Sequence, residues 1–126
     1  MKPIILSTER LILRRAIDID PENLFRNYTG DIDCSRFLTR KPHKDVDQTA
    51  AFLNKWCDIA WEQESDQFSW VVSLPENNEA IGVFIVSKEG HKSEIHSGIG
   101  RIFWGKGFAT EIGHKVVEWL MAQPEL

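Results

Sequence analysis

The stretch FWGKGFATE, Phe103 to Glu111, places two glycines and a lysine directly before an amphipathic run at 109–122 that predicts a helix. Glycine adopts positive φ without a Cβ clash, so Gly105 and Gly107 let successive backbone N–H groups converge on one point. The amino end of the helix adds the positive end of its dipole. With Lys106 as a further positive charge, the stretch predicts a phosphate-binding loop. The alternative is a tight turn that binds nothing.

A predicted strand precedes this loop and the predicted helix follows it. Residues 94–101 predict a strand that Gly98 and Gly100 weaken. Glycines within a strand often mark the close approach of another backbone or of a ligand. After the loop, Pro124 ends a pattern of apolar residues at helical spacing. The members of this stripe are Ala109, Ile112, Val116, Val117, Leu120 and Met121.

The first part of the chain predicts one strand and one short helix. Residues 8–15 alternate apolar and polar side chains, as a half-buried strand does. Asp20 is the predicted N-cap of the helix, because Pro21 follows it at the first helical position. Gly30 ends this helix.

The middle of the chain predicts a longer helix and then a hairpin. Asp45 or Asp47 is the predicted N-cap of a helix that runs to about residue 64. The segments 68–73 and 80–86 predict two antiparallel strands joined by a turn at 75–79. Another turn is predicted at 89–91.

The composition fits one domain spanning residues 1–126, with 42% hydrophobic and 27% charged residues. A net charge of −4 with scattered Lys and Arg predicts no nucleic-acid partner, because polyanion binding needs clustered cations. Cys34 and Cys57 lack metal-site spacing, so no metal is expected and a reducing, cytoplasmic setting is favoured. No apolar run approaches the about 20 residues of a membrane span, so no membrane partner is expected.

Two common phosphate-binding loops do not match the glycine stretch. The NTPase loop GxxxxGK[ST] requires Ser or Thr after the lysine, but Gly107 follows Lys106. The dinucleotide pattern GxGxxG requires a third glycine where this chain has Thr110, and no later strand carries a ribose-binding acid.

A third loop does match. The segment IGRIFWGKGFATEIGHKVVEWL, Ile99 to Leu120, resembles the acetyl-CoA-binding motif of the GCN5-related N-acetyltransferase (GNAT) family. The similarity is greatest to the branch that includes the ribosomal-protein alanine N-acetyltransferases. STERLILRRA (7–16) and AIGVFIV (80–86) resemble the first and third strands of that family. The resemblance implies an α/β (α+β, mixed-sheet) GNAT fold with the order β-α-α-β-β-β-α.

The resemblance also implies which residues bind acetyl-CoA. The family pattern [Q/R]-x-x-G-x-[G/A] falls on 104–109, where Trp104 departs from Gln or Arg. By this resemblance, the backbone amides of 105–110 hold the pyrophosphate, and the strand near 99–101 pairs with the pantetheine arm. The implied cofactor-binding residues are Ile99, Gly100, Arg101, Trp104, Gly105, Lys106, Gly107, Phe108, Ala109 and Thr110.

The implied reaction is direct acetyl transfer to a primary amine on a protein N-terminus or a small molecule. In the family a backbone N–H, here near Ile99, stabilises the carbonyl oxygen. Glu94 is the first candidate to deprotonate the amine and His96 the second, because the two share one face of the predicted strand. The alternative is that both simply face solvent. The family's proton-donating tyrosine lies on a later helix, and Tyr28 does not match it, so no acid is assigned.

The acceptor site is expected to involve Trp56, Trp61 and the loop 29–44, although helix packing is the alternative for the tryptophans. His43, His91 and His114 are expected to be exposed.

The family continues past its CoA-binding helix with a strand, a helix and a hairpin. The sequence therefore predicts a C-terminally incomplete fold that is a truncated form or completes itself by association, as a homo-oligomer. A non-catalytic CoA-binding module that self-associates is the alternative function. A loop with a purely structural role is a third possibility.

Overall fold

A computed structural model of the chain describes residues 2–35, 41–89 and 92–123. The predicted helix stop at Pro124 and the tip of the predicted turn at Gly90 and His91 lie outside these residues. The elements in chain order are β1 (Leu6–Ser7), β2 (Ile12–Arg14), α1 (Asp20–Leu24), a π-helical segment (Phe25–Thr29), α2 (Ile32–Ser35), α3 (Val46–Leu53), a second π-helical segment (Asn54–Ile59), α4 (Ala60–Glu62), β3 (Gln67–Ser73), β4 (Ala80–Glu89), β5 (Lys92–Ile99), a 3-10 turn (Arg101–Phe103) and α5 (Phe108–Met121).

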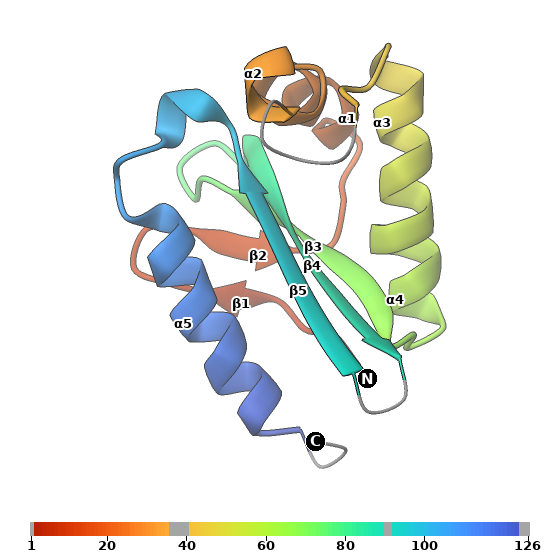
Figure 1. Ribbon diagram of the computed structural model, residues 1–126, viewed down its shortest axis with the longest axis vertical. Helices are drawn as coiled ribbons and strands as arrows, with labels where there is room; N and C mark the ends of the chain where they lie inside the picture. The colour runs from red at the N-terminus through yellow and green to blue at the C-terminus, as the bar shows by residue number, and fades with distance from the viewer. Residues whose placement is uncertain (1, 36–40, 90–91, 124–126) are drawn as a thin grey trace.

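The strands form one antiparallel sheet in which they lie in chain order, from β1 at one edge to β5 at the other. Helices α1 to α4 cover one face of the sheet and α5 covers the other (Figure 1). This arrangement leaves β5 as an edge strand between the two helical layers. The predicted α+β fold class and the predicted order of elements are confirmed.

Each face of the sheet has its own apolar core. On the α5 face, Trp70 of β3 and Trp119 of α5 pack edge to face with ring centroids 5.2 Å apart. On the opposite face, Leu24 of α1 and Leu53 of α3 pack over Val71. Burial of large apolar side chains on both faces is the main stabilisation of such a layered domain.

The strand predicted at 94–101 is β5 at Lys92–Ile99, and a 3-10 turn begins at Arg101. Two other predictions also differ from the structure. The strand predicted at 8–15 is confirmed only for β2, because residues 8–11 form the turn that joins β2 to β1. In this turn the Thr8 N–H donates to the Leu11 carbonyl at 2.9 Å. The short helix α2 falls in a stretch for which the sequence predicts a loop. Both are local structures that hydrophobic periodicity does not reveal.

The prediction that Asp20 is the N-cap of α1 is wrong, because Asp20 forms a buried ion pair with Arg14 instead. Asp20 is the first residue of α1, and its side chain makes no cap hydrogen bond. Its carboxylate instead accepts hydrogen bonds from both terminal nitrogens of the buried Arg14, at 2.7 and 2.9 Å, and from the Ile17 N–H at 2.8 Å. A buried carboxylate requires such partners, so the guanidinium outcompetes the helix end. The same ion pair fixes α1 against β2.

Candidate functional site

The glycine loop has the backbone conformation that the sequence predicts. Gly105 and Gly107 both have φ of 79°, in the left-handed region. Gly107 is the N-cap residue of α5, and no side chain caps this helix end. Within the described ranges, the N–H groups of residues 105–110 donate to no protein acceptor. The loop therefore presents a group of unpaired donors at the positive end of a helix.

The edge of β5 continues this set of donors. The Gly100 N–H donates to the Ile81 carbonyl at 2.7 Å, and hydrogen-bonded and non-bonded pairs alternate along an antiparallel ladder. Gly82 and Ile99 therefore form a non-bonded pair, and the backbone groups of Ile99 point away from β4. The indole Nε1 of Trp104 donates to the Ile99 carbonyl at 2.7 Å, which agrees with this direction. The Ile99 N–H donates to no acceptor among the described residues.

Two adjoining cavities connect the glycine loop with this edge. A cavity of about 220 Å³ lies at the loop, and one of about 260 Å³ lies at the end of β5. They share Ile99, Trp104 and Ala109 as lining residues. The first cavity is also lined by Phe103, Gly105, Gly107, Phe108 and Thr110, and the second by Tyr28, Cys34, Ser97 and Gly98. An extended ligand can thus reach from the loop amides to the Ile99 N–H.

Three of the expected cofactor-binding residues lie away from these cavities. Gly100, Arg101 and Lys106 are not among the lining residues. Arg101 is turned toward α2, where its Nε donates to Asp31 at 2.7 Å and lies 3.6 Å from Asp33. This hydrogen bond lowers the pKa of Asp31 below its ordinary value. Arg101 thus joins the 3-10 turn to the segment that leads into α2.

The structure gives a physical reason for Gly98, near the end of β5, and for Gly100, just past its end. A Cβ on Gly98 would lie 1.8 Å from the Tyr28 hydroxyl, and a Cβ on Gly100 would lie 2.4 Å from the Asn27 carbonyl. Neither position has room for a side chain, because the π-helical segment 25–29 passes at close range over the end of β5 and the residue that follows it. The predicted close approach is present, but it is an approach by the protein's own chain.

Glu94 and His96 lie on one face of β5, as the sequence predicts, and both side chains are exposed. The Nε2 of His96 is 3.4 Å from the Oε2 of Glu94. Neither residue lines the two cavities. Along β5, Glu94 is about 17 Å and His96 about 10 Å from Ile99, at the rise of an extended strand. Neither side chain therefore contacts the edge at Ile99 directly.

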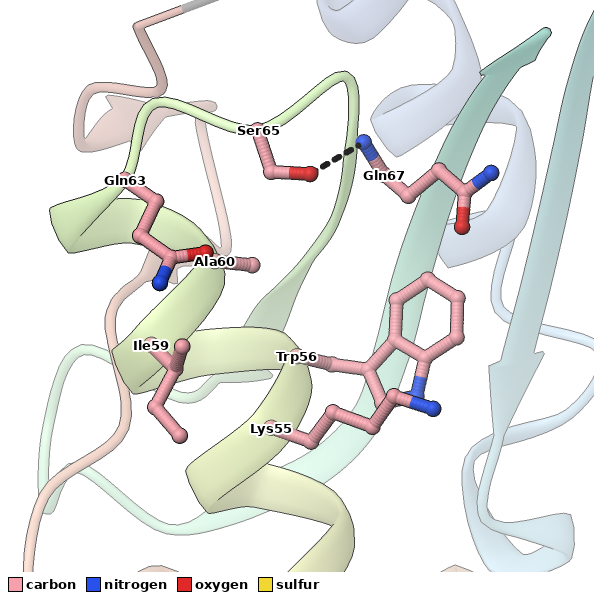
Figure 2. Close-up of a pocket in the computed structure, with 7 residues that line it drawn as sticks. All are labelled: Lys55, Trp56, Ile59, Ala60, Gln63, Ser65 and Gln67. Carbon is pink, nitrogen blue, oxygen red and sulfur yellow. Dashed lines mark hydrogen bonds between the residues drawn. The ribbon is translucent and has the colours of Figure 1, made fainter.

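The two tryptophans expected at the acceptor site have different surroundings. Trp56 stacks on Phe52 at 6.3 Å between ring centroids and lines a cavity of about 200 Å³ with Lys55 and Gln67, which Figure 2 shows. Trp61 instead donates its Nε1–H to the Ser69 carbonyl at 2.8 Å and packs against the α5-side core. The contacts of Trp61 therefore indicate a packing role, whereas Trp56 faces a cavity.

The cavity beside Trp56 lies on the same sheet face as the two polar residues of β5. Ser87 of β4 pairs with both Gln67 and Glu94, so these three residues form one row across the sheet. Two strand spacings separate Gln67 from Glu94, or about 10 Å. The cavity beside Trp56 and the Glu94 side chain therefore lie at opposite ends of this row, on the same face of the sheet.

One expectation for the histidines is wrong. His43 is half-buried, and its Nδ1 lies 2.8 Å from the hydroxyl of the buried Thr49. His114 is exposed, as expected, and His91 lies outside the described residues.

A family model described as an acetyltransferase (GNAT) domain matches residues 10–126. The chain belongs to this family. None of the helices in the described parts of this GNAT domain has the length and apolar character that crossing a membrane requires.

Curated relatives of this GNAT domain carry names that agree with the family. It is 30% identical over 117 residues to an uncharacterized N-acetyltransferase p20 of Bacillus licheniformis, and 28% identical over 118 residues to an uncharacterized N-acetyltransferase YoaA of Bacillus subtilis. These matches cover 90% and 91% of the chain. The chain spans only 64% and 65% of the length of the two relatives.

Solved structures share the fold. A GNAT-family acetyltransferase of Bacillus anthracis has a TM-score of 0.75 at 22% identity, with 92% of this chain and 65% of that chain covered. A putative ribosomal-protein-serine acetyltransferase of Vibrio cholerae has a TM-score of 0.75 at 15% identity, with 93% and 67% covered.

The Tyr28 hydroxyl is a feature of the site that the sequence did not indicate. Tyr28 belongs to the π-helical segment, is 5% exposed, and lines the cavity at the end of β5 with Ser97 and Gly98. It comes close to β5 only because two segments far apart in the chain cross there. The glycine at 98 is the one available signal, since it marks a strand position that something approaches closely.

Proposed function

We propose that this GNAT domain binds acetyl-CoA and transfers its acetyl group directly to a primary amine. The observation that carries the proposal is the presence of unpaired backbone donors at both ends of two adjoining cavities, the N–H groups of residues 105–110 and the N–H of Ile99. Donors at a positive helix end suit a pyrophosphate. An outward N–H on a strand edge suits the amide-bearing arm of coenzyme A and, at Ile99, the carbonyl oxygen that gains charge during transfer.

The proposed chemistry needs one base and one acid. The acceptor loses a proton to Glu94 or His96 through water, and its nitrogen then attacks the thioester carbonyl. The C–N bond forms, the C–S bond breaks, and the departing thiolate takes a proton. Tyr28 lines the same cavity as Ile99, and we assign its hydroxyl as the proton donor. The new amide nitrogen releases its second proton to solvent, and the tyrosinate regains a proton from solvent.

The proposed acceptor is an amine on a protein N-terminus or a small molecule, held between Trp56 and the exposed side of β5. A cationic amine is attracted both by the Glu94 carboxylate and by the face of an indole ring. The similarity to the Vibrio cholerae protein, a putative ribosomal-protein-serine acetyltransferase, supports a protein N-terminus as one acceptor to test. A cytoplasmic setting and self-association at the open edge of β5 belong to the same proposal.

Thermal unfolding with and without acetyl-CoA tests the binding step. Ligand that binds only the folded state raises the melting temperature, and saturation about 100-fold above Kd corresponds to about 2.7 kcal/mol. Desulfo-CoA, which lacks the thiol but keeps every phosphate, should give a similar shift. No shift with millimolar acetyl-CoA contradicts the proposal.

The second candidate function is a CoA-binding module without turnover. The exposure of Glu94 and His96, and their separation from Ile99, favour it. Release of free thiol in the presence of a panel of amines distinguishes the two functions. For an enzyme, Glu94→Gln or His96→Gln lowers kcat by about 100-fold, within the range of general base catalysis. The exposed Glu118→Gln and His114→Gln on α5 are the matched controls.

A further inference from the structure

Arg10 lies beside the glycine loop although it is far from it in the sequence. It stands in the turn between β1 and β2, which runs next to the amino-terminal part of α5 (Figure 1). Its backbone N–H donates to Oε2 of Glu111 at 3.0 Å, and its Nε donates to Oε1 at 2.8 Å. The guanidinium carbon lies 4.6 Å from the centre of the Phe108 ring. These contacts hold the guanidinium in one place at the start of α5.

The far side of this guanidinium faces the loop. A Cβ on Gly107 would lie 3.5 Å from the Nη2 of Arg10. In the described part of the chain, neither Nη1 nor Nη2 of Arg10 donates to a protein acceptor. The Arg10 side chain is 45% exposed, so a ligand can reach these nitrogens. Arginine presents such paired donors in a geometry that matches phosphate oxygens.

We propose that Arg10 is a phosphate-binding residue of the coenzyme A site, a role that rests on the proposed function above. Its Nη2 lies near Gly107, whose N–H group and those that follow it are unpaired, so an anion at this helix end can meet both a charge and fixed dipoles. Glu111 holds the Nε side and leaves the Nη side open. Neither Arg10 nor Lys106, the cation within the loop itself, lines the cavity at the loop. Arg10 differs from the exposed Lys106 because Glu111 and the Phe108 ring hold its guanidinium in place.

Glu111 complicates a simple test of Arg10. Its carboxylate lies in the first turn of α5, and Arg10 offsets its negative charge. Removal of Arg10 alone would leave that charge unbalanced near the ligand and weaken phosphate binding even if Arg10 touched no phosphate. The double variant Arg10→Gln/Glu111→Gln removes both charges and separates the two explanations.

Calorimetric titration with CoA and with dephospho-CoA measures the contribution of Arg10. We expect Arg10→Gln to bind CoA about 10-fold or more weakly, as the loss of a charged hydrogen bond implies, and the double variant to stay weak. Arg26→Gln, at an exposed arginine of the first π-helical segment, is the matched control and keeps wild-type affinity. If Arg10→Gln loses affinity for CoA but not for dephospho-CoA, Arg10 binds the 3′-phosphate. If it loses affinity equally for both ligands, Arg10 binds the pyrophosphate.

Two results overturn the proposal: wild-type affinity in Arg10→Gln, or wild-type affinity in the double variant. If Arg10→Gln does not fold, Arg10→Lys carries the test, because lysine keeps the charge but loses the paired donors. Unchanged CoA affinity in a folded Arg10→Lys then contradicts a direct contact through Nη1 and Nη2. Absence of CoA binding by the wild-type chain is a different outcome, which overturns the proposed function itself.

Discussion

Helices α3 and α5 begin in opposite ways. At α3, the Asp45 carboxylate accepts the Gln48 N–H at 2.9 Å, and the Gln48 side chain accepts the Lys44 N–H at 2.8 Å. At α5, the N-cap is Gly107, with φ of 79° and no side-chain cap. The first helix end is closed by its own side chains, and the second is open.

This difference distinguishes a helix end whose amides are satisfied within the protein from one whose amides are available to a ligand. A side-chain cap stabilises a helix by about 1 kcal/mol because it satisfies amides that have no partner within the helix. An uncapped end lacks this stabilisation but keeps its donors for a ligand. Of these two helices, α5 is the one that combines the open end with a cavity and a neighbouring arginine, so α5 is the one suited to bind a phosphate.

The largest effect is expected from a carboxylate in the open loop. Gly107→Asp places a negative charge where the phosphate is proposed to bind, and several charged hydrogen bonds of about 1.5–3 kcal/mol each are then lost. We expect CoA affinity to fall by at least about 100-fold, which corresponds to about 2.7 kcal/mol. Isothermal titration measures this loss.

Gly107→Asn is the control for backbone strain, because asparagine also tolerates the left-handed region but carries no charge. It should bind CoA more weakly than the wild type but more tightly than Gly107→Asp. Equal affinities in all three proteins would show that the loop does not hold an anion, and the contrast with α3 would then have no functional meaning.

A smaller effect is expected at the capped end. Asp45→Ala removes the carboxylate that accepts the Gln48 N–H, so the free energy of unfolding should fall by about 1 kcal/mol. Denaturant titration measures the change. Because α3 lies on the opposite face from α5, CoA affinity should stay at the wild-type value. A loss of affinity as large as that of the Gly107 variants would remove the distinction between the two helix ends.

The smallest effect concerns the pH dependence of Glu111 at the open end. Partial burial raises its pKa, but hydrogen bonds from the Thr8 hydroxyl and from Arg10 outweigh burial and hold the pKa below the ordinary value of 4.5. Its contribution to stability is therefore present above pH 4.5 and is lost as the pH falls through the lowered folded pKa.

Glu111→Gln should accordingly reduce the loss of stability between neutral and acidic pH, by less than about 1 kcal/mol. Thermal unfolding across this pH range checks the prediction, with the exposed Glu118→Gln as the control. An acid-induced loss as large as in the wild type would mean that Glu111 does not tie the β1–β2 turn to α5.

Periodicity and local signals predicted most of the fold. The apolar stripe predicted α5, and Asp45 was one of two predicted caps for α3. Apolar runs of strand-forming residues predicted β3 and β4. The prediction failed where a side chain with a local role in the sequence binds a residue from another segment instead. Asp20 has the sequence context of an N-cap, but the buried Arg14 binds its carboxylate, and no local pattern reveals that partner.

The sequence by itself determined that a glycine-rich loop precedes an amphipathic helix, because backbone freedom and helical spacing are properties of neighbouring residues. The tertiary structure alone decided which groups meet that loop. Arg10 reaches Gly107 because the β1–β2 turn packs against the start of α5, and Tyr28 reaches Gly98 because the first π-helical segment lies close to the end of β5. Contacts between distant segments depend on how layers pack, and packing is a property of the whole chain.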